Sequence, residues 1–261
     1  MKTLLVTSLA LLFVGSVSLA QSDHTMVYWR LDPNVKTCSM DIDPSLTQAQ
    51  WHEFTKQVAA LSAFKSLAPA QTLGKLNFHV GLDYGSTPVD QHSLAWINTF
   101  VHPDEECPLG DKVEFPTLRA GMGVSDDMDI GLYWTEAPGA NYGMIGGEFK
   151  YAFLQEDEGL PAAAVRGSFT LLTGVPDFDL GVYSVELLAS KTIATLTPYL
   201  GLRTSLAVGT ETTTKVNLKT ERIPVAQGYV GIAYSLWMLN VAAEYNVASV
   251  NTLAFAIGVT F

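Results

Sequence analysis

The hydrophobic pattern of the chain changes its period near residue 73. From there to the last residue, apolar side chains alternate with small or polar ones, and the final run reads Leu253, Phe255, Ile257, Val259 and Phe261. A period of two is typical of a strand whose two faces meet different surroundings. Because a membrane barrel strand has lipid on one face and a lumen on the other, the pattern predicts a transmembrane β-barrel.

Ten segments between residues 73 and 261 show this alternation, with turn residues between them, which predicts an all-β, antiparallel up-and-down barrel of about ten strands. Single-chain bacterial barrels have an even number of strands. Two further candidate strands, 25–31 and 92–101, leave a twelve-stranded barrel as the alternative. The ten segments are 73–84, 113–124, 128–136, 142–154, 161–172, 178–190, 193–206, 225–236, 239–247 and 250–261.

The connections between these segments alternate in length. Bacterial barrels have short periplasmic turns and longer outer loops. We therefore expect the last strand to run down to a periplasmic carboxyl end, and the two longest loops, 85–112 and 207–224, to lie outside. The predicted periplasmic turns are 125–128, 155–160, the turn near Lys191, and Trp237-Met238.

The first twenty residues resemble a secretory signal peptide. Lys2 gives a positive start, residues 4–14 are almost all apolar, and Ser18-Leu19-Ala20 offers a cleavage site of small residues. The sequence therefore predicts export, with 1–20 removed and a mature chain that begins at Gln21.

Residues 21–72 differ from the barrel segments because their apolar side chains have helical spacing. Asp43 and Pro44 can begin a helix, and Thr47 with Gln50 forms a possible capping box. The pattern predicts one amphipathic helix that ends before Pro69. Either this helix is a plug in the lumen, or it covers the periplasmic mouth of the barrel. Its apolar face would consist of Trp51, Phe54, Val58 and Leu61.

The charged residues within the strands fall on the parity opposite to the apolar side chains. A basic residue on the lipid face would cost about 2–4 kcal/mol at the membrane midplane, so these charges are expected to face the lumen. Inside a narrow barrel they should pair, and Glu148 with Arg166 is the first pair expected. The predicted network comprises Lys75, Asp83, Arg119, Asp129, Glu148, Lys150, Arg166, Glu186, Arg203 and Glu244.

The cysteines and the net charge restrict the remaining possibilities. Cys38 and Cys107 are the only cysteines, and an exported chain meets an oxidising compartment, so a disulfide between them is expected. The net charge of −11 argues against nucleic acid as a partner.

Motifs for catalysis or cofactor binding are missing from the sequence. No G-x-S-x-G motif lies near any histidine, and there is no phosphate-binding loop. His79 is the best candidate for a hydrolytic site, although a hydrogen-bonded lumen histidine is the simpler interpretation. We expect no enzymatic activity, no cofactor and no metal site.

Three features resemble the outer-membrane β-barrel proteins of Gram-negative bacteria as a broad class. They are the alternating last strand that ends in Phe261, the stretch Thr197-Pro198-Tyr199-Leu200-Gly201-Leu202, and the turn from Ser125 to Gly131. The resemblance covers residues 73–261. It implies an outer-membrane location, contact with membrane lipid, and recognition of the carboxyl-terminal strand by the barrel-assembly machinery.

The leading functional hypothesis is a non-enzymatic, porin-like barrel that is structural or allows passive or gated passage of a small solute. An apolar solute is suggested by Leu180, Val182 and Leu188 on the lumen parity, together with the apolar face of the helix. A surface adhesin or receptor that uses loops 85–112 and 207–224 is the alternative. An outer-membrane hydrolase is the third hypothesis.

Overall fold

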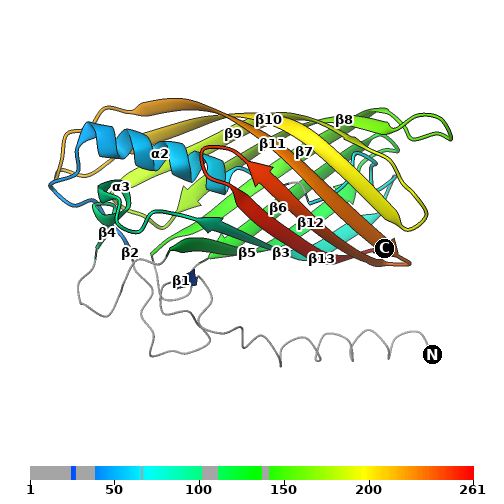
Figure 1. Cartoon of the computed structure of the whole chain (residues 1–261), viewed down its shortest axis with the longest axis horizontal. Helices are drawn as coiled ribbons and strands as arrows, with labels where there is room; N and C mark the ends of the chain where they lie inside the picture. Colours follow the sequence, from blue (N-terminus) through cyan, green and yellow to red (C-terminus); the bar gives the residue numbers. More distant parts are fainter. Residues whose placement is uncertain (1–24, 28–38, 66, 102–110, 137–140) are drawn as a thin grey trace, which may run out of the picture.

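Ten antiparallel strands close into a barrel in the computed structural model of the chain (Figure 1). The structure describes residues 25–27, 39–65, 67–101, 111–136 and 141–261. Each barrel strand pairs with the barrel strands before and after it, and β13 pairs with β3 to complete the ring. The strands are β3 (Phe78–Pro88), β5 (Lys112–Gly123), β6 (Met128–Glu136), β7 (Gly143–Leu154), β8 (Ala162–Thr173), β9 (Phe178–Ser190), β10 (Leu196–Glu211), β11 (Glu221–Leu236), β12 (Leu239–Val247) and β13 (Thr252–Thr260).

The predicted all-β fold with ten strands is confirmed, and the twelve-stranded alternative is wrong. The strand β1 (Thr25–Val27) pairs in parallel with only Lys112–Glu114 of β5. The other candidate segment contains the short helix α3 (Leu94–Ile97) and β4 (Phe100–Val101). Because β4 pairs with β2 (Ser39–Met40) in a separate two-stranded sheet, it adds no strand to the barrel.

The first barrel strand begins later than the sequence pattern predicted, at Phe78 instead of residue 73. Just before it, Gly74 and Leu76 have positive φ angles of 82° and 62°, so the chain turns sharply here. An extended strand cannot include these conformations. Residues 73–77 therefore lead up to β3 but are not part of the strand.

The last strand closes the barrel through its final residue. The Phe78 amide donates to the Phe261 carbonyl at 2.8 Å, and the Phe261 amide donates to the Phe78 carbonyl at 2.9 Å. Their rings stack with centroids 6.2 Å apart. The carboxyl-terminal residue thus extends the β13–β3 ladder.

The outer wall of the barrel is apolar over its middle. Large side chains such as Leu132, Leu202 and Val230 are exposed there. Charged residues on the outward parity of the described strands occur only next to the connections 89–111, 137–142, 174–177 and 212–220. They are Lys112, Glu114, Glu136, Asp179 and Arg222.

The two ends of the barrel differ in their connections. The end that holds Phe261 has the connections 124–127, 155–161, 191–195 and 237–238, and we call it the turn end. The opposite end, which we call the loop end, has 89–111, 137–142, 174–177, 212–220 and 248–251. Within the described ranges, no helix is long and apolar enough to cross a membrane.

Candidate functional site: a lumen closed by the amino-terminal segment

The helix α2 (Gln48–Ser62) lies at the loop end of the barrel, opposite the carboxyl terminus, against β9, β10 and β11 (Figure 1). Its predicted capping box is present, because the Thr47 hydroxyl accepts from the Gln50 amide and the Gln50 side chain accepts from the Thr47 amide. The helix ends at Ser62, before the predicted limit. Lys65 lies just beyond this end, and its ammonium group donates to the carbonyls of Ala60 and Leu61 in the last turn and of Ala63 after it.

The apolar face of α2 is buried against the luminal wall. Trp51 and Phe54 are fully buried, and their ring centroids lie 5.2 and 5.8 Å from that of Phe178 on β9. A Cβ atom at Gly209 on β10 would lie 3.0 Å from both the Trp51 ring and the Thr55 hydroxyl. The helix therefore packs directly on the backbone of β10 and fills the loop-end half of the lumen.

Polar contacts fasten the residues before α2 to several connections at the loop end. Lys215, in the connection 212–220, contacts Asp41 and lies 2.8 Å from Asp177. The Ile42 amide donates to Asp177 at 2.9 Å, and the Met40 amide donates to the Asn141 side chain at 2.8 Å. We call the set Asp41, Asp177 and Lys215 the latch.

The latch residues influence one another's ionisation. Hydrogen bonds to Asp177 and Asp41 raise the pKa of the Lys215 ammonium group. Burial alone would raise the pKa of Asp177, but hydrogen bonds with Asp41, Lys215 and the Ile42 amide hold it below its ordinary value. Burial and the shared hydrogen bond with Asp177 raise the pKa of Asp41.

Beyond α2 the chain runs through the lumen toward the turn end. We call residues 63–65 and 67–77 the thread, and 39–65 with 67–77 together the plug. Side chains of the wall bond the main chain of this region at several levels. Thr170 donates to the Ser62 carbonyl at 2.9 Å, and Arg119 donates to the Lys65 carbonyl at 3.3 Å.

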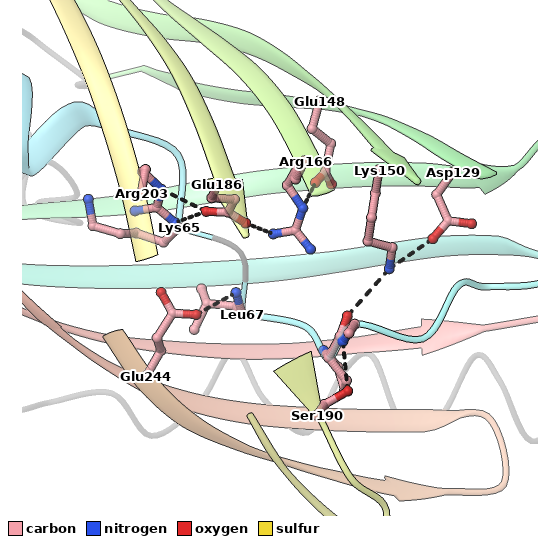
Figure 2. A network of polar contacts seen from close by, with 12 residues as sticks. Lys65, Leu67, Asp129, Glu148, Lys150, Arg166, Glu186, Ser190, Arg203 and Glu244 are labelled. Carbon is pink, nitrogen blue, oxygen red and sulfur yellow. Dashed lines mark hydrogen bonds and ion pairs between the residues drawn. The ribbon is translucent and has the colours of Figure 1, made fainter. Parts of the chain in front are cut away.

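The next bonds lie closer to the turn end, and Figure 2 shows part of them. The Leu67 amide donates to Glu244 at 3.0 Å, and the Ala70 amide donates to the Ser190 hydroxyl at 2.9 Å. Lys150 donates to the Gln71 carbonyl at 2.6 Å and to the Pro69 carbonyl at 3.4 Å, and the Leu73 amide donates to Asp129 at 3.0 Å.

A chain of ion pairs crosses the luminal wall from β10 to β7 (Figure 2). Arg203 lies 2.7 Å from Glu186, Glu186 lies 2.9 Å from Arg166, and Arg166 lies 3.0 Å from Glu148. The side chains of Arg166, Glu186 and Arg203 are at most 2% exposed. Lys150 with Asp129, 2.9 Å apart, and Arg119 with Asp83, 2.8 Å apart, form two further buried pairs. These contacts compensate charges whose burial alone would be costly.

The structure brings together nine of the ten residues predicted to form the lumen network, and Lys75 is the exception. Lys75 is exposed in the turn before β3, so the prediction for this residue is wrong. Its luminal parity was inferred from a strand that was thought to begin at residue 73. The ion pair expected between Glu148 and Arg166 forms diagonally, since Lys150 is the residue directly opposite Arg166.

Sequence reasoning missed the neutral residues that hold the plug. Ser190, Thr170 and Gln227 each bond its main chain, and Gln227 does so by donating to the Ala60 carbonyl at 2.8 Å. All three share the luminal parity of the charged network, which is the signal that could have found them. Phe64 was also missed; its ring lies 5.2 Å from the Arg119 guanidinium and 4.7 Å from the Tyr133 ring.

The apolar luminal residues that suggested an apolar solute are covered by the plug. Leu180 and Val182 belong to the apolar cluster that surrounds α2. Leu188 packs in a second cluster that includes Leu67 of the thread and Tyr199 of the wall. Their positions are thus explained by packing within the chain.

A cavity of about 410 Å³ lies beside the thread in the turn-end half of the lumen, and we call it the vestibule. Its lining includes Lys150, Asp129, Gln71 and, in the turn 237–238, Trp237. His79 also lines it, and its Nδ1 lies 3.1 Å from the Thr260 hydroxyl. Among the described residues, no three His, Cys, Asp or Glu side chains form a group suited to a metal ion.

Cys38 and Cys107 lie outside the described residues. Nearby, Ser39 of β2 pairs with Val101 of β4. The predicted disulfide stays a prediction. The outer loops are shorter than predicted, because strands extend into them and leave 89–111 and 212–220 as the connections.

A closed antiparallel barrel, an outer wall that is apolar over its middle and a charged lumen define an outer-membrane β-barrel protein of the Gram-negative type. No protein-family model and no curated protein sequence match the chain.

Several solved outer-membrane proteins are similar in structure at low sequence identity. An outer membrane channel from Pseudomonas putida F1 matches with a TM-score of 0.45 and 11% identity, over 74% of this chain and 98% of that chain. Neisserial surface protein A matches with a TM-score of 0.30 and 12% identity, over 70% and 95% of the two chains. OprG from Pseudomonas aeruginosa matches with a TM-score of 0.30 and 12% identity, over 74% and 99%. At these scores the similarities do not bear on the function of this chain, and its class follows from its own geometry.

Proposed function

We propose that the chain is a non-enzymatic outer-membrane barrel whose own plug closes the lumen, and that a small solute passes only when the thread leaves the wall. The observation that carries this proposal is the set of hydrogen bonds from wall side chains to the main chain of the thread. They hold a segment across the path that a solute would take.

The thread is better suited to move than α2. Removing Trp51 and Phe54 from their pocket would expose two fully buried aromatic side chains to the lumen. Each hydrogen bond of the thread to a neutral hydroxyl contributes about 0.5–1.5 kcal/mol net, and each one to an ionised side chain about 1.5–3 kcal/mol, and water can replace both kinds. The vestibule lies directly beside these bonds. Release of the thread alone is therefore the least costly way to open the lumen.

The lengths of the connections orient this arrangement in the membrane. If short turns face the periplasm and long loops face outward, the turn end is periplasmic. The plug then enters the lumen from the outer side, with α2 outermost. This favours an outer plug over the alternative of a cap on the periplasmic mouth.

A reversible cross-link between thread and wall tests the proposal. Ala70→Cys with Ser190→Cys joins two positions already linked by a 2.9 Å hydrogen bond, in a background with Cys38→Ser and Cys107→Ser. We expect brief conductance events in planar bilayers for the reduced protein, none after oxidation, and their return after reduction. As a matched control, Ala242→Cys with Ala256→Cys joins paired positions on β12 and β13, and its openings should persist after oxidation.

Equal conductance of the oxidised and reduced Ala70–Ser190 pair would show that the thread is not the gate. Absence of conductance in every variant would leave a structural or surface-binding role and would contradict passage of a solute.

A further inference from the structure

The turn-end half of the lumen recognises the main chain of the thread. Carboxylates of Glu244 and Asp129 accept from amides, whereas the cationic groups of Arg119 and Lys150 donate to carbonyls. Every peptide offers these amide and carbonyl groups, whatever its side chains. The contacts at Pro69 and Ala70 illustrate this, since neither residue has a polar side chain. The main side-chain contacts of the thread come from Phe64, Leu67, Gln71 and Thr72.

The recognising groups are held in place by the wall itself. Asp129 and Lys150 pair with each other, and Arg119 pairs with Asp83. Arg119, Asp129, Lys150 and Glu244 are at most 6% exposed, and they come from β5, β6, β7 and β12. Binding a peptide here therefore requires little rearrangement of the wall, which reduces the cost of association.

The vestibule supplies space for a second chain to approach. It lies next to the thread from Leu67 to Leu73 and is also lined by Thr192 and Trp237 of the turn end. An incoming segment can therefore meet the recognising side chains at the end where the thread is held by polar contacts. In the loop-end half, the described residues bury α2 in an apolar cluster that fills the lumen there.

We propose that the turn-end half of the lumen is a binding site for an extended polypeptide, which the thread occupies as an intramolecular ligand and another peptide can occupy once the thread is displaced. The site tolerates different sequences, because its contacts are made chiefly to the main chain. The incoming peptide enters from the turn end, and small residues suit the level of Ala70, which is fully buried. This inference rests on the proposed function, since the thread must be able to leave.

The test uses the full chain, folded first and then cut. A protease site inserted after the exposed Lys75 separates the plug from the barrel without touching a barrel strand. Fluorescent peptides with the sequence of residues 60–75, or with the same composition in shuffled order, are added, and exchange is followed by anisotropy. We expect both peptides to bind, with affinities within about tenfold of each other.

A wall variant distinguishes binding in this site from binding elsewhere. Ser190→Ala removes the acceptor for the Ala70 amide. Because this change weakens the resident thread as well as the added peptide, the readout is the dissociation rate of the bound peptide, which should rise roughly tenfold for both peptides. Ser184→Ala on the same strand is the matched control, because its hydroxyl bonds Ser205 at 2.8 Å, and it should leave both dissociation rates unchanged.

Binding of the native peptide without the shuffled one would overturn the inference, and so would binding that is insensitive to Ser190→Ala. Conductance of the same cut sample separates the two proposals. If the channel opens but no peptide binds, the proposed peptide site is contradicted and the proposed gating by the thread still stands. If the cut sample shows neither openings nor peptide binding, both proposals are contradicted.

Discussion

The two halves of the lumen are filled by the same segment in different ways. In the loop-end half, α2 buries aromatic and aliphatic side chains against β9, β10 and β11. In the turn-end half, the thread is held through its main chain by a wall of paired charges and hydroxyl groups. Apolar packing resists exchange with water, whereas hydrogen bonds can be replaced by water at small net cost. The loop-end half therefore holds an anchor, and the turn-end half holds a part that can move.

The two ends of the barrel should be accessible to a reagent from opposite sides of the membrane. Ser45 is exposed just before α2, and Gly159 is exposed in the turn 155–161 with open space around its Cβ position. We expect a membrane-impermeant maleimide to label Ser45→Cys but not Gly159→Cys on intact cells, in a background with Cys38→Ser and Cys107→Ser. Both should react after the outer membrane is permeabilised. The reverse pattern would put α2 on the periplasmic side.

Loss of one charge in the turn-end wall should have the largest effect on stability. Arg166→Met removes the cation that lies between Glu148 and Glu186 and leaves two buried carboxylates without it. We expect a loss of about 3–5 kcal/mol in the free energy of unfolding, measured with urea in detergent or lipid. Lys56→Met is the control, because its 3.8 Å contact with Glu53 is exposed and should be worth less than about 1 kcal/mol. Similar losses for the two variants would show that the pairs do not stabilise the wall.

Truncation of an apolar contact should weaken the anchor. Leu180→Ala on β9 removes a buried side chain from the cluster around α2. We expect the free energy of unfolding to fall by about 2–5 kcal/mol, and the loss to be smaller if α2 moves to fill the cavity. Leu94→Ala at the same mouth changes a side chain that is 55% exposed and should cost less than about 0.5 kcal/mol. If Leu180→Ala has no larger effect than Leu94→Ala, α2 is not anchored by its apolar face.

The barrel was predictable because its signals are local and repeated. Alternation marked each strand, turn residues separated them, and the boundaries of β6, β9 and β12 agree with the predicted segments. The charges of the lumen followed from the same parity. Lys75 was misplaced because the apolar alternation continues into residues that actually turn, at Gly74 and Leu76, before the strand begins.

The path of the plug was not predictable from the sequence. The capping box and the spacing from Trp51 to Leu61 identified the helix, but not the end of the barrel where it packs. That position depends on contacts between distant residues, such as Thr55 against Gly209 and Asp41 with Lys215. The thread has no regular hydrophobic period, because it is held mainly through its main chain. Main-chain amide and carbonyl groups are nearly the same for every residue type, so the sequence does not show which of them are bound.

The smallest effect should come from protonation of Glu156 at the turn end, and it should change the frequency of channel openings. Burial alone would raise the pKa of Glu156, but hydrogen bonds from the Thr192 amide and hydroxyl, and from the Gln71 side chain of the thread, hold it below its ordinary value of 4.5. A lowered pKa means that these contacts stabilise the folded state above pH 4.5, and that this stabilisation is lost as the pH falls through the lower value.

Acidification below pH 4.5 on the turn-end side of a planar bilayer should therefore increase the frequency of openings, by no more than about fivefold because Glu156 is solvated. Glu156→Gln should already show the higher frequency at neutral pH and should lose this part of the pH dependence. The side chain of Glu158 is exposed in the same turn, and Glu158→Gln is the matched control, for which we expect wild-type behaviour. If Glu156→Gln keeps the full acid response, the Gln71 contact does not hold the thread, and its retention must depend on the bonds deeper in the wall.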